Sequence, residues 1–224
     1  MGEFLMSIEM QLSGFLFLLI IIILIFCDAL LGHGTIDNLK SEAKLQKINE
    51  DPKKFEISFV LLTTEHITIV VLAVMLFMAF SSFNVILGVI WFIFRGGEGL
   101  LNIYGKKNYW GLSNLARQYS NASGAEKNEL IDLGSSILKT KTSLFAITQI
   151  MFSIGTLAYS ILFVTYETAV PVIVGWFGIV ASITYGLGNG IQLVKPNLKA
   201  LWQVGGLLVL IFELVLGTWL LFLS

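Results

Sequence analysis

The chain has 224 residues, of which 56% are apolar and only 13% are charged. Soluble domains carry roughly 25% charged residues, so this composition excludes a soluble globular protein and indicates a membrane protein. The net charge of −1 argues against a nucleic-acid partner, which needs a basic surface. A single cysteine, Cys27, excludes an intrachain disulfide, and the only histidines are His33 and His66. We therefore expect no metal site and no cofactor.

Six segments are long and apolar enough to cross a hydrocarbon core of about 30 Å, which takes about 20 helical residues. Their apolar residues run continuously and do not alternate with polar ones, which indicates helices and not strands. The sequence predicts an all-α, polytopic membrane protein. A short extracellular N-terminus (residues 1–11) is followed by one six-helix transmembrane domain over residues 12–223. The predicted spans run approximately from Leu12 to Gly32, Ile57 to Phe80, Phe83 to Gly105, Leu144 to Thr165, Val170 to Val194 and Ala200 to Leu223.

The basic residues predict the orientation of these spans. Of 14 Lys and Arg residues, 13 fall on one side of the predicted topology. They lie in long loops at about 33–56 and 106–143 and in the short loop before residue 200. The positive-inside rule places these loops in the cytoplasm and both termini outside the cell membrane.

Both long loops have helical character. In the first, Glu50 and Lys54 stand four residues apart, a spacing that favours an ion pair on a helix. In the second, Ser123 and Glu126 form the pattern of a capping box that opens a helix. We expect these segments to lie as interfacial helices on the inner leaflet, with a partner-docking surface as the alternative.

The most informative residues are the ionisable ones inside the spans: Arg95, Glu65, Glu98 and Glu213. Each charge at mid-helix costs about 2.5–3.5 kcal/mol on insertion scales, so each should face a partner or water. A rise of about 1.5 Å per residue puts the four in one layer, slightly toward the cytoplasm. We predict that Arg95 pairs with at least one of the glutamates. His66 is expected to point about 100° away from Glu65, toward a different neighbour.

Further polar side chains share helix faces at this level. They form small-and-polar stripes on the fourth and fifth spans, and the polar faces of the third to sixth spans could together enclose a hydrated pocket. Gly206 and Gly217 share a face of the sixth span with Glu213 and would let another helix approach closely. The predicted ligand-binding or polar network consists of Arg95, Glu98, Glu213, Glu65, Asn102, Asn189, Gln192, Gln149 and Tyr185.

Charge balance leaves two interpretations of this layer. Three glutamates around one arginine leave two formal negative charges, which protonated glutamates, a bound cation or a charged His66 could neutralise. In one interpretation, an Arg95–Glu pair and protonated carboxyls only lock the bundle. In the other, the layer is a ligand site or part of a proton or ion pathway.

Several short motifs resemble those of a prokaryotic membrane-protein family, domain of unknown function 4386. The resemblance rests on Arg95-Gly-Gly-Glu98 with Asn102, on Pro171 with Gly175 and Gly178, and on Phe212-Glu213 with Thr218-Trp219-Leu220-Leu221. Val172 departs from the family, which usually has a basic residue after the proline. The resemblance implies a six-helix membrane bundle, and it implies no activity.

Three functions are compatible with the sequence. The first is binding or transport of a small molecule, an ion or a lipid-like ligand at the polar layer. The second is a non-catalytic structural or accessory membrane subunit. The third is an intramembrane enzyme that uses a glutamate as acid or base on a hydrophobic substrate. An enzyme is the less favoured class, because no nucleophile motif such as G-x-S-x-G is present, and no catalytic residue is assigned. The expected partners are membrane lipids and a small ligand or cation, and a homo-oligomer is left open.

Overall fold

The computed structural model describes residues 8–37, 39–195, 198 and 200–223, without the side chains of residues 35, 37 and 108. This part of the chain is almost entirely helical and contains no strand. The helices in chain order are α1 (Ile8–Ala29), α2 (His33–Asp37), α3 (Ser41–Glu50), α4 (Pro52–Phe80), α5 (Val85–Asn121), α6 (Gly124–Thr165), α7 (Val172–Val194) and α8 (Ala200–Phe222).

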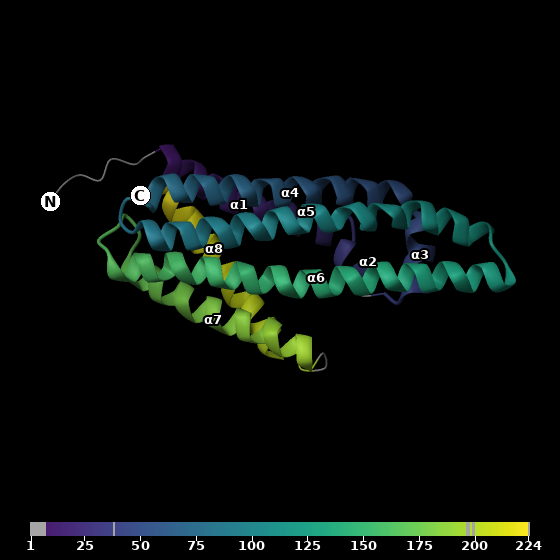
Figure 1. Ribbon diagram of the computed structural model, residues 1–224. Coiled ribbons are helices and arrows are strands. Elements are labelled where there is room, and N and C mark those ends of the chain that lie inside the picture. The colour runs from purple at the N-terminus through teal and green to yellow at the C-terminus, as the bar shows by residue number, and fades with distance from the viewer. Residues whose placement is uncertain (1–7, 38, 196–197, 199, 224) are drawn as a thin grey trace.

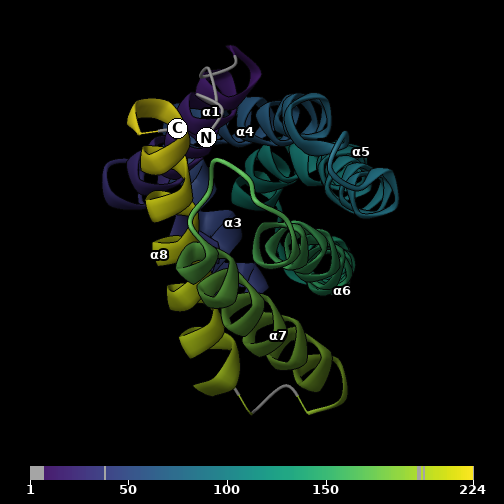
Figure 2. The same ribbon diagram turned by 90° about the vertical axis from the view of Figure 1, so that its left-hand side faces the viewer.

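Among the described residues, six helices are long and apolar enough to cross a membrane: α1, α4, α5, α6, α7 and α8. The predicted all-α six-helix membrane bundle is therefore confirmed. Each of these helices packs against the next one along the chain, and α8 packs back against α1, so the six form a closed ring (Figure 2). The start of α1, the end of α8 and the α4–α5 and α6–α7 connections lie at one end of the ring (Figure 1).

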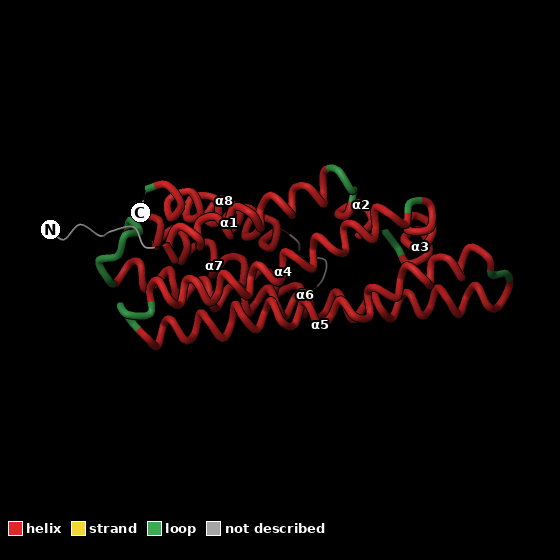
Figure 3. The backbone as a smooth tube through the Cα atoms, turned by 90° about the horizontal axis from the view of Figure 1, so that it is seen from above, coloured by secondary structure: helices red, strands yellow, loops and turns green. Residues whose placement is uncertain are grey.

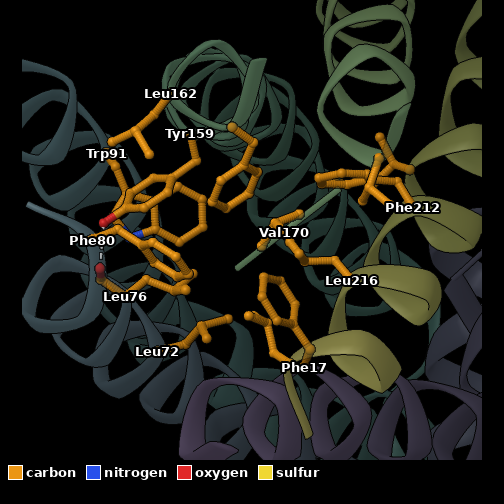
Figure 4. Close-up of a cluster of buried hydrophobic side chains, with 14 of the residues drawn as sticks. Phe17, Leu72, Leu76, Phe80, Trp91, Tyr159, Leu162, Val170, Phe212 and Leu216 are labelled. Carbon is orange, nitrogen blue, oxygen red and sulfur yellow. Dashed lines mark hydrogen bonds between the residues drawn. The ribbon is translucent and has the colours of Figure 1, made fainter. Parts of the chain in front are cut away.

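Large apolar and aromatic side chains fill the centre of the ring (Figure 4). Phe17 of α1, Trp91 of α5 and Tyr159 of α6 are almost fully buried there. The polar side-chain atoms of the last two donate to backbone carbonyls of α4. Trp91 Nε1 donates to Ala73 O at 3.2 Å, and Tyr159 Oη donates to Leu76 O at 2.5 Å. These bonds hold α4, α5 and α6 in a fixed register. On α5, Trp91 lies about one helical turn before Arg95.

The ring closes where α1 meets α8 at two glycines. A Cβ atom on Gly14 would lie 2.6 Å from Gly217 O, and one on Gly217 would lie 2.8 Å from Phe17 Cβ. Only residues without a side chain allow backbones to come this close. The predicted close approach of another helix beside Glu213 is therefore confirmed at Gly217. It is not found at Gly206, where a Cβ atom would make only an ordinary contact, 3.6 Å from Tyr185 Cε2.

Two of the helices extend well beyond the others. Helix α5 has 37 residues and α6 has 42, so α6 alone spans about 63 Å at 1.5 Å per residue. Together they form a hairpin that projects past α1, α7 and α8 (Figures 1 and 3). The second long loop thus consists of continuations of membrane helices, and the expectation of a separate interfacial helix there is wrong.

A second hydrophobic cluster explains why the α5–α6 hairpin extends beyond the other helices. Leu45 and Ile48 of α3 are 1% exposed and pack with Tyr109, Leu112 and other apolar residues of α5. The apolar faces of α3 and the hairpin thus bury each other instead of facing lipid.

Two local expectations need correction. Helix α6 begins at Gly124 as the capping box predicts, but Ser123 makes no side-chain capping bond. Glu50 and Lys54 form ion pairs with other residues. Lys47 Nζ lies 2.9 Å from Glu50, and Lys54 Nζ lies 3.5 Å from Asp51. The hydrogen bond that Lys47 donates to Glu50 raises the pKa of Lys47.

Candidate functional site

Arg95 of α5 lies at the centre of the charged layer. Its Nη1 donates to Glu98 Oε2 at 2.6 Å, one turn along the same helix, and its Nη2 donates to Glu213 Oε1 of α8 at 3.4 Å. Helices α5 and α8 stand opposite each other in the ring, so the guanidinium bridges its interior. The predicted pairing of Arg95 with a glutamate is confirmed, and we call Arg95, Glu98 and Glu213 the carboxyl layer.

The carboxyl layer is closely packed. Arg95, Glu98 and Glu213 are 1%, 3% and 8% exposed. The guanidinium carbon lies 4.3 Å from the centre of the Phe152 ring and 5.5 Å from that of Trp91, distances at which an aromatic face attracts a cation. The hydrated pocket expected from the sequence is therefore not open at this layer.

A glycine on α6 makes room for the arginine. A Cβ atom on Gly155 would lie 2.9 Å from Arg95 Cγ and 3.5 Å from its Cδ. Neither Gly155 nor Phe152 was among the residues predicted from the sequence, since both are apolar. The available signal was their spacing of three residues on α6, which places them on one helix face.

Glu65 has a different partner from the other glutamates. Its Oε2 lies 2.5 Å from His66 Nδ1, and that ring nitrogen also contacts the carbonyl of Leu62 one turn back. The expectation that His66 points to a different neighbour is therefore wrong, because the imidazole folds back along α4 toward the carboxyl beside it. The backbone of α4 stays close to α5 at this level, since a Cβ atom on Gly99 would lie 3.0 Å from His66 O.

The uncharged members of the predicted network form two smaller groups. Tyr185 Oη donates to Gln149 Oε1 at 2.9 Å, and Asn189 Nδ2 donates to the Tyr185 carbonyl at 2.8 Å. Separately, Thr148 Oγ1 donates to Asn102 Oδ1 at 3.3 Å and so joins α6 to α5. Gln192 lies half-buried on α7, about one turn beyond Asn189.

Phe152 stands between the charged and the uncharged groups. One contact of its ring is the Arg95 guanidinium, and another is the edge of Tyr185, with ring centres 5.8 Å apart. The structure thus joins Arg95 to both Glu98 and Glu213, and the Phe152 ring lies between this group and Tyr185.

The charges of the carboxyl layer do not balance. One guanidinium neutralises one of its two carboxylates, and the other needs a proton or a cation in a site this buried. Arg95 Nε and Asn189 Oδ1 are moreover buried without a hydrogen-bond partner, which is unusual for polar atoms in folded proteins. Across the described residues, no group of three His, Cys, Asp or Glu is arranged to hold a metal ion.

Comparison with known proteins identifies the family. The chain matches domain of unknown function (DUF4386) over residues 12–223. It belongs to this family. The match covers α4 to α8 in full, α1 from residue 12 onward, and every residue of the carboxyl layer. No curated protein and no solved structure matches the chain.

Proposed function

We propose that this DUF4386 protein binds a proton or a small cation at the carboxyl layer. The proposal is carried by one observation: two buried carboxyls share a single guanidinium. An unpaired carboxylate is costly in a low-dielectric interior, so uptake of one positive charge stabilises the folded protein.

The packing supports a small ligand over an organic one. Phe152, Trp91 and Gly155 lie directly against Arg95 and leave it 1% exposed. A proton or a bare cation needs little space at such a site. Transport of a larger polar molecule would require these helices to separate, so we place binding ahead of transport.

The test is thermal unfolding of the purified protein in detergent, measured against pH and added monovalent and divalent cations. If the folded layer holds a proton that the unfolded chain loses, stability falls as the pH rises above about 4, where the carboxyls of the unfolded chain ionise. A bound cation should reverse that fall. Glu98→Gln and Glu213→Gln each supply a neutral side chain and should weaken both responses, whereas Glu129→Gln on the exposed face of α6 should not. Equal responses in all four proteins would refute the proposal.

A structural or accessory role is the second candidate, and the closed packing of the layer favours it. Arg95 ties α5 to α8 across the ring, which by itself stabilises the arrangement of helices. For such a role, the double variant Glu98→Gln/Glu213→Gln should unfold at a lower temperature than the parent, because the buried Arg95 charge loses both carboxylates. The parent should then show no response to cations.

We also propose that the end of the ring nearest the α5–α6 hairpin is cytoplasmic. The basic residues at that end support this orientation, through the positive-inside rule. Single cysteines placed at Asn49 and Asn128 should react with a membrane-impermeant thiol reagent only after cells are permeabilised. A cysteine at Ser82 should react in intact cells, and the native Cys27 is fully buried and adds little background. The opposite labelling pattern would reverse the orientation.

A further inference from the structure

A cavity rich in lysine lies where α3 meets α6. It has a volume of about 360 Å³, within the range of small-ligand sites. We call it the lysine pocket, and its polar wall is formed by Lys40, Ser41, Lys44, Lys139, Lys141 and Thr142.

The pocket is strongly positive. Its wall contains four lysines, and none of its described lining residues is acidic. The nearest acid in the first turn of α3, Glu42, accepts a hydrogen bond from Tyr119 Oη of α5 at 2.7 Å and is engaged there. Lys40 and Lys139 are exposed at the pocket, whereas Lys141 Nζ lies 4.2 Å from the centre of the Tyr109 ring of α5.

Helix α3 adds to the positive potential. It begins at Ser41, and Lys40 at its N-cap makes no side-chain capping bond. The backbone N–H groups of a first helical turn have no acceptor within the helix and favour an anion. Ser41 Oγ lies 2.7 Å from Ser135 Oγ of α6, which fixes this helix end against the hairpin.

The other wall of the pocket is apolar. Leu39, Leu138 and Phe145 line it. Phe145 lies one residue inside the predicted fourth span, so the pocket sits where α6 enters the hydrocarbon region. A group that combines a negative head with an apolar tail matches both walls at this depth.

We propose that the lysine pocket binds the phosphate group of an anionic phospholipid. Lys40 and Lys139 supply charge-assisted donors to phosphate oxygens, and the start of α3 supplies backbone N–H groups. The apolar wall receives the first part of the lipid chains. Free phosphate would use the same donors but gain nothing from Leu39, Leu138 and Phe145, so the lipid is the ligand that uses the whole pocket. This inference does not depend on the proposed function of the carboxyl layer.

Native mass spectrometry of the purified protein in detergent tests the proposal. The probes are short-chain phosphatidic acid and phosphatidylglycerol, with phosphatidylcholine as the zwitterionic comparison and inorganic phosphate as the soluble one. Lys40 and Lys139 are exposed, so Lys40→Ala/Lys139→Ala should fold normally. Lys53→Ala/Lys107→Ala removes the same charge from exposed positions outside the pocket and is the matched control.

We expect the anionic lipids to bind the parent and the control variant alike. Loss of two lysines should weaken that binding by about tenfold or more, since each basic residue near a charged lipid contributes a several-fold effect. Lys139→Glu alone should weaken it at least as strongly, which keeps the test valid if the double variant is poorly folded. Phosphatidylcholine and inorganic phosphate should bind much more weakly.

Three outcomes would overturn the proposal. An equal loss of lipid binding in the control variant would mean that anionic lipids are attracted diffusely to the basic end of the bundle. Equal binding of phosphatidylcholine would mean that the apolar wall alone holds lipid. Displacement of the lipid by inorganic phosphate at similar concentration would identify the ligand as a soluble phosphate.

Discussion

Removal of the Arg95 guanidinium is the sharpest perturbation of the carboxyl layer. Arg95→Ala deletes the contacts to Glu98 at 2.6 Å and to Glu213 at 3.4 Å, together with stacking on Phe152. Removing one partner of a buried pair costs about 3–5 kcal/mol, because the other charge stays buried. In chains of this length, 1 kcal/mol shifts the melting temperature by about 2–4 °C, so the expected loss is about 6–20 °C.

The assay is thermal unfolding in detergent, with Lys195→Ala as the matched control. Lys195 is exposed at the end of α7, so its loss should change stability by no more than about 0.5 kcal/mol. The difference in melting temperature between the parent and Arg95→Ala should be smaller at low pH and larger at high pH. Protons neutralise the stranded carboxylates, so the folded state binds more protons than the unfolded one and stability falls as pH rises.

A rescue experiment separates charge from packing. Arg95→Met with Glu98→Gln and Glu213→Gln replaces the ion pairs by neutral side chains of similar volume, which is often close to neutral for stability. The triple variant should therefore recover most of the loss. If Arg95→Ala unfolds like Lys195→Ala, or if the triple variant is no more stable than Arg95→Ala, the reasoning about buried charge is wrong.

Two further predictions concern the packing around this layer. Gly155→Ala should lower the melting temperature, because its Cβ atom would lie 2.9 Å from Arg95 Cγ; Gly111→Ala, which meets no atom within 4 Å, should instead gain up to about 1 kcal/mol of helix propensity. Tyr159→Phe removes the hydrogen bond to Leu76 O and should cost about 1–3 kcal/mol, since the carbonyl stays buried. Equal melting of the two glycine variants, or an unchanged melting temperature in Tyr159→Phe, would contradict these assignments.

The membrane helices were predictable because length and hydropathy decide them. The spacing of three residues between Arg95 and Glu98 also fixes that contact within one helix. The partnership with Glu213 follows only in part, since equal depth brings side chains to one level but does not say which helices face each other. The order of helices around the ring comes from tertiary packing, including the close contact of Gly14 with Gly217.

The continuous hairpin shows where sequence reasoning stopped short. The segment after residue 106 is polar enough to suggest a loop, yet Tyr109, Leu112, Ala116 and Tyr119 recur at helical spacing and are all buried. That period was a usable signal for a helix with an apolar face. Its partner, α3, could not be identified from it, because any amphipathic segment or a lipid surface could have covered the same face.

The number of carboxyls in the carboxyl layer bears on the choice between binding of a proton or cation and a purely structural role. A purely structural link across the ring needs one positive and one negative charge, and apolar residues of similar volume often stabilise a core as well or better. The contact of Arg95 with Glu213 at 3.4 Å already links α5 to α8, so Glu98, on the same helix as Arg95, adds a negative charge that the link does not require. A buried charge that packing does not need is retained at a cost, and uptake of a proton or cation offsets that cost. The surplus carboxyl therefore favours binding at this layer over a structural role alone.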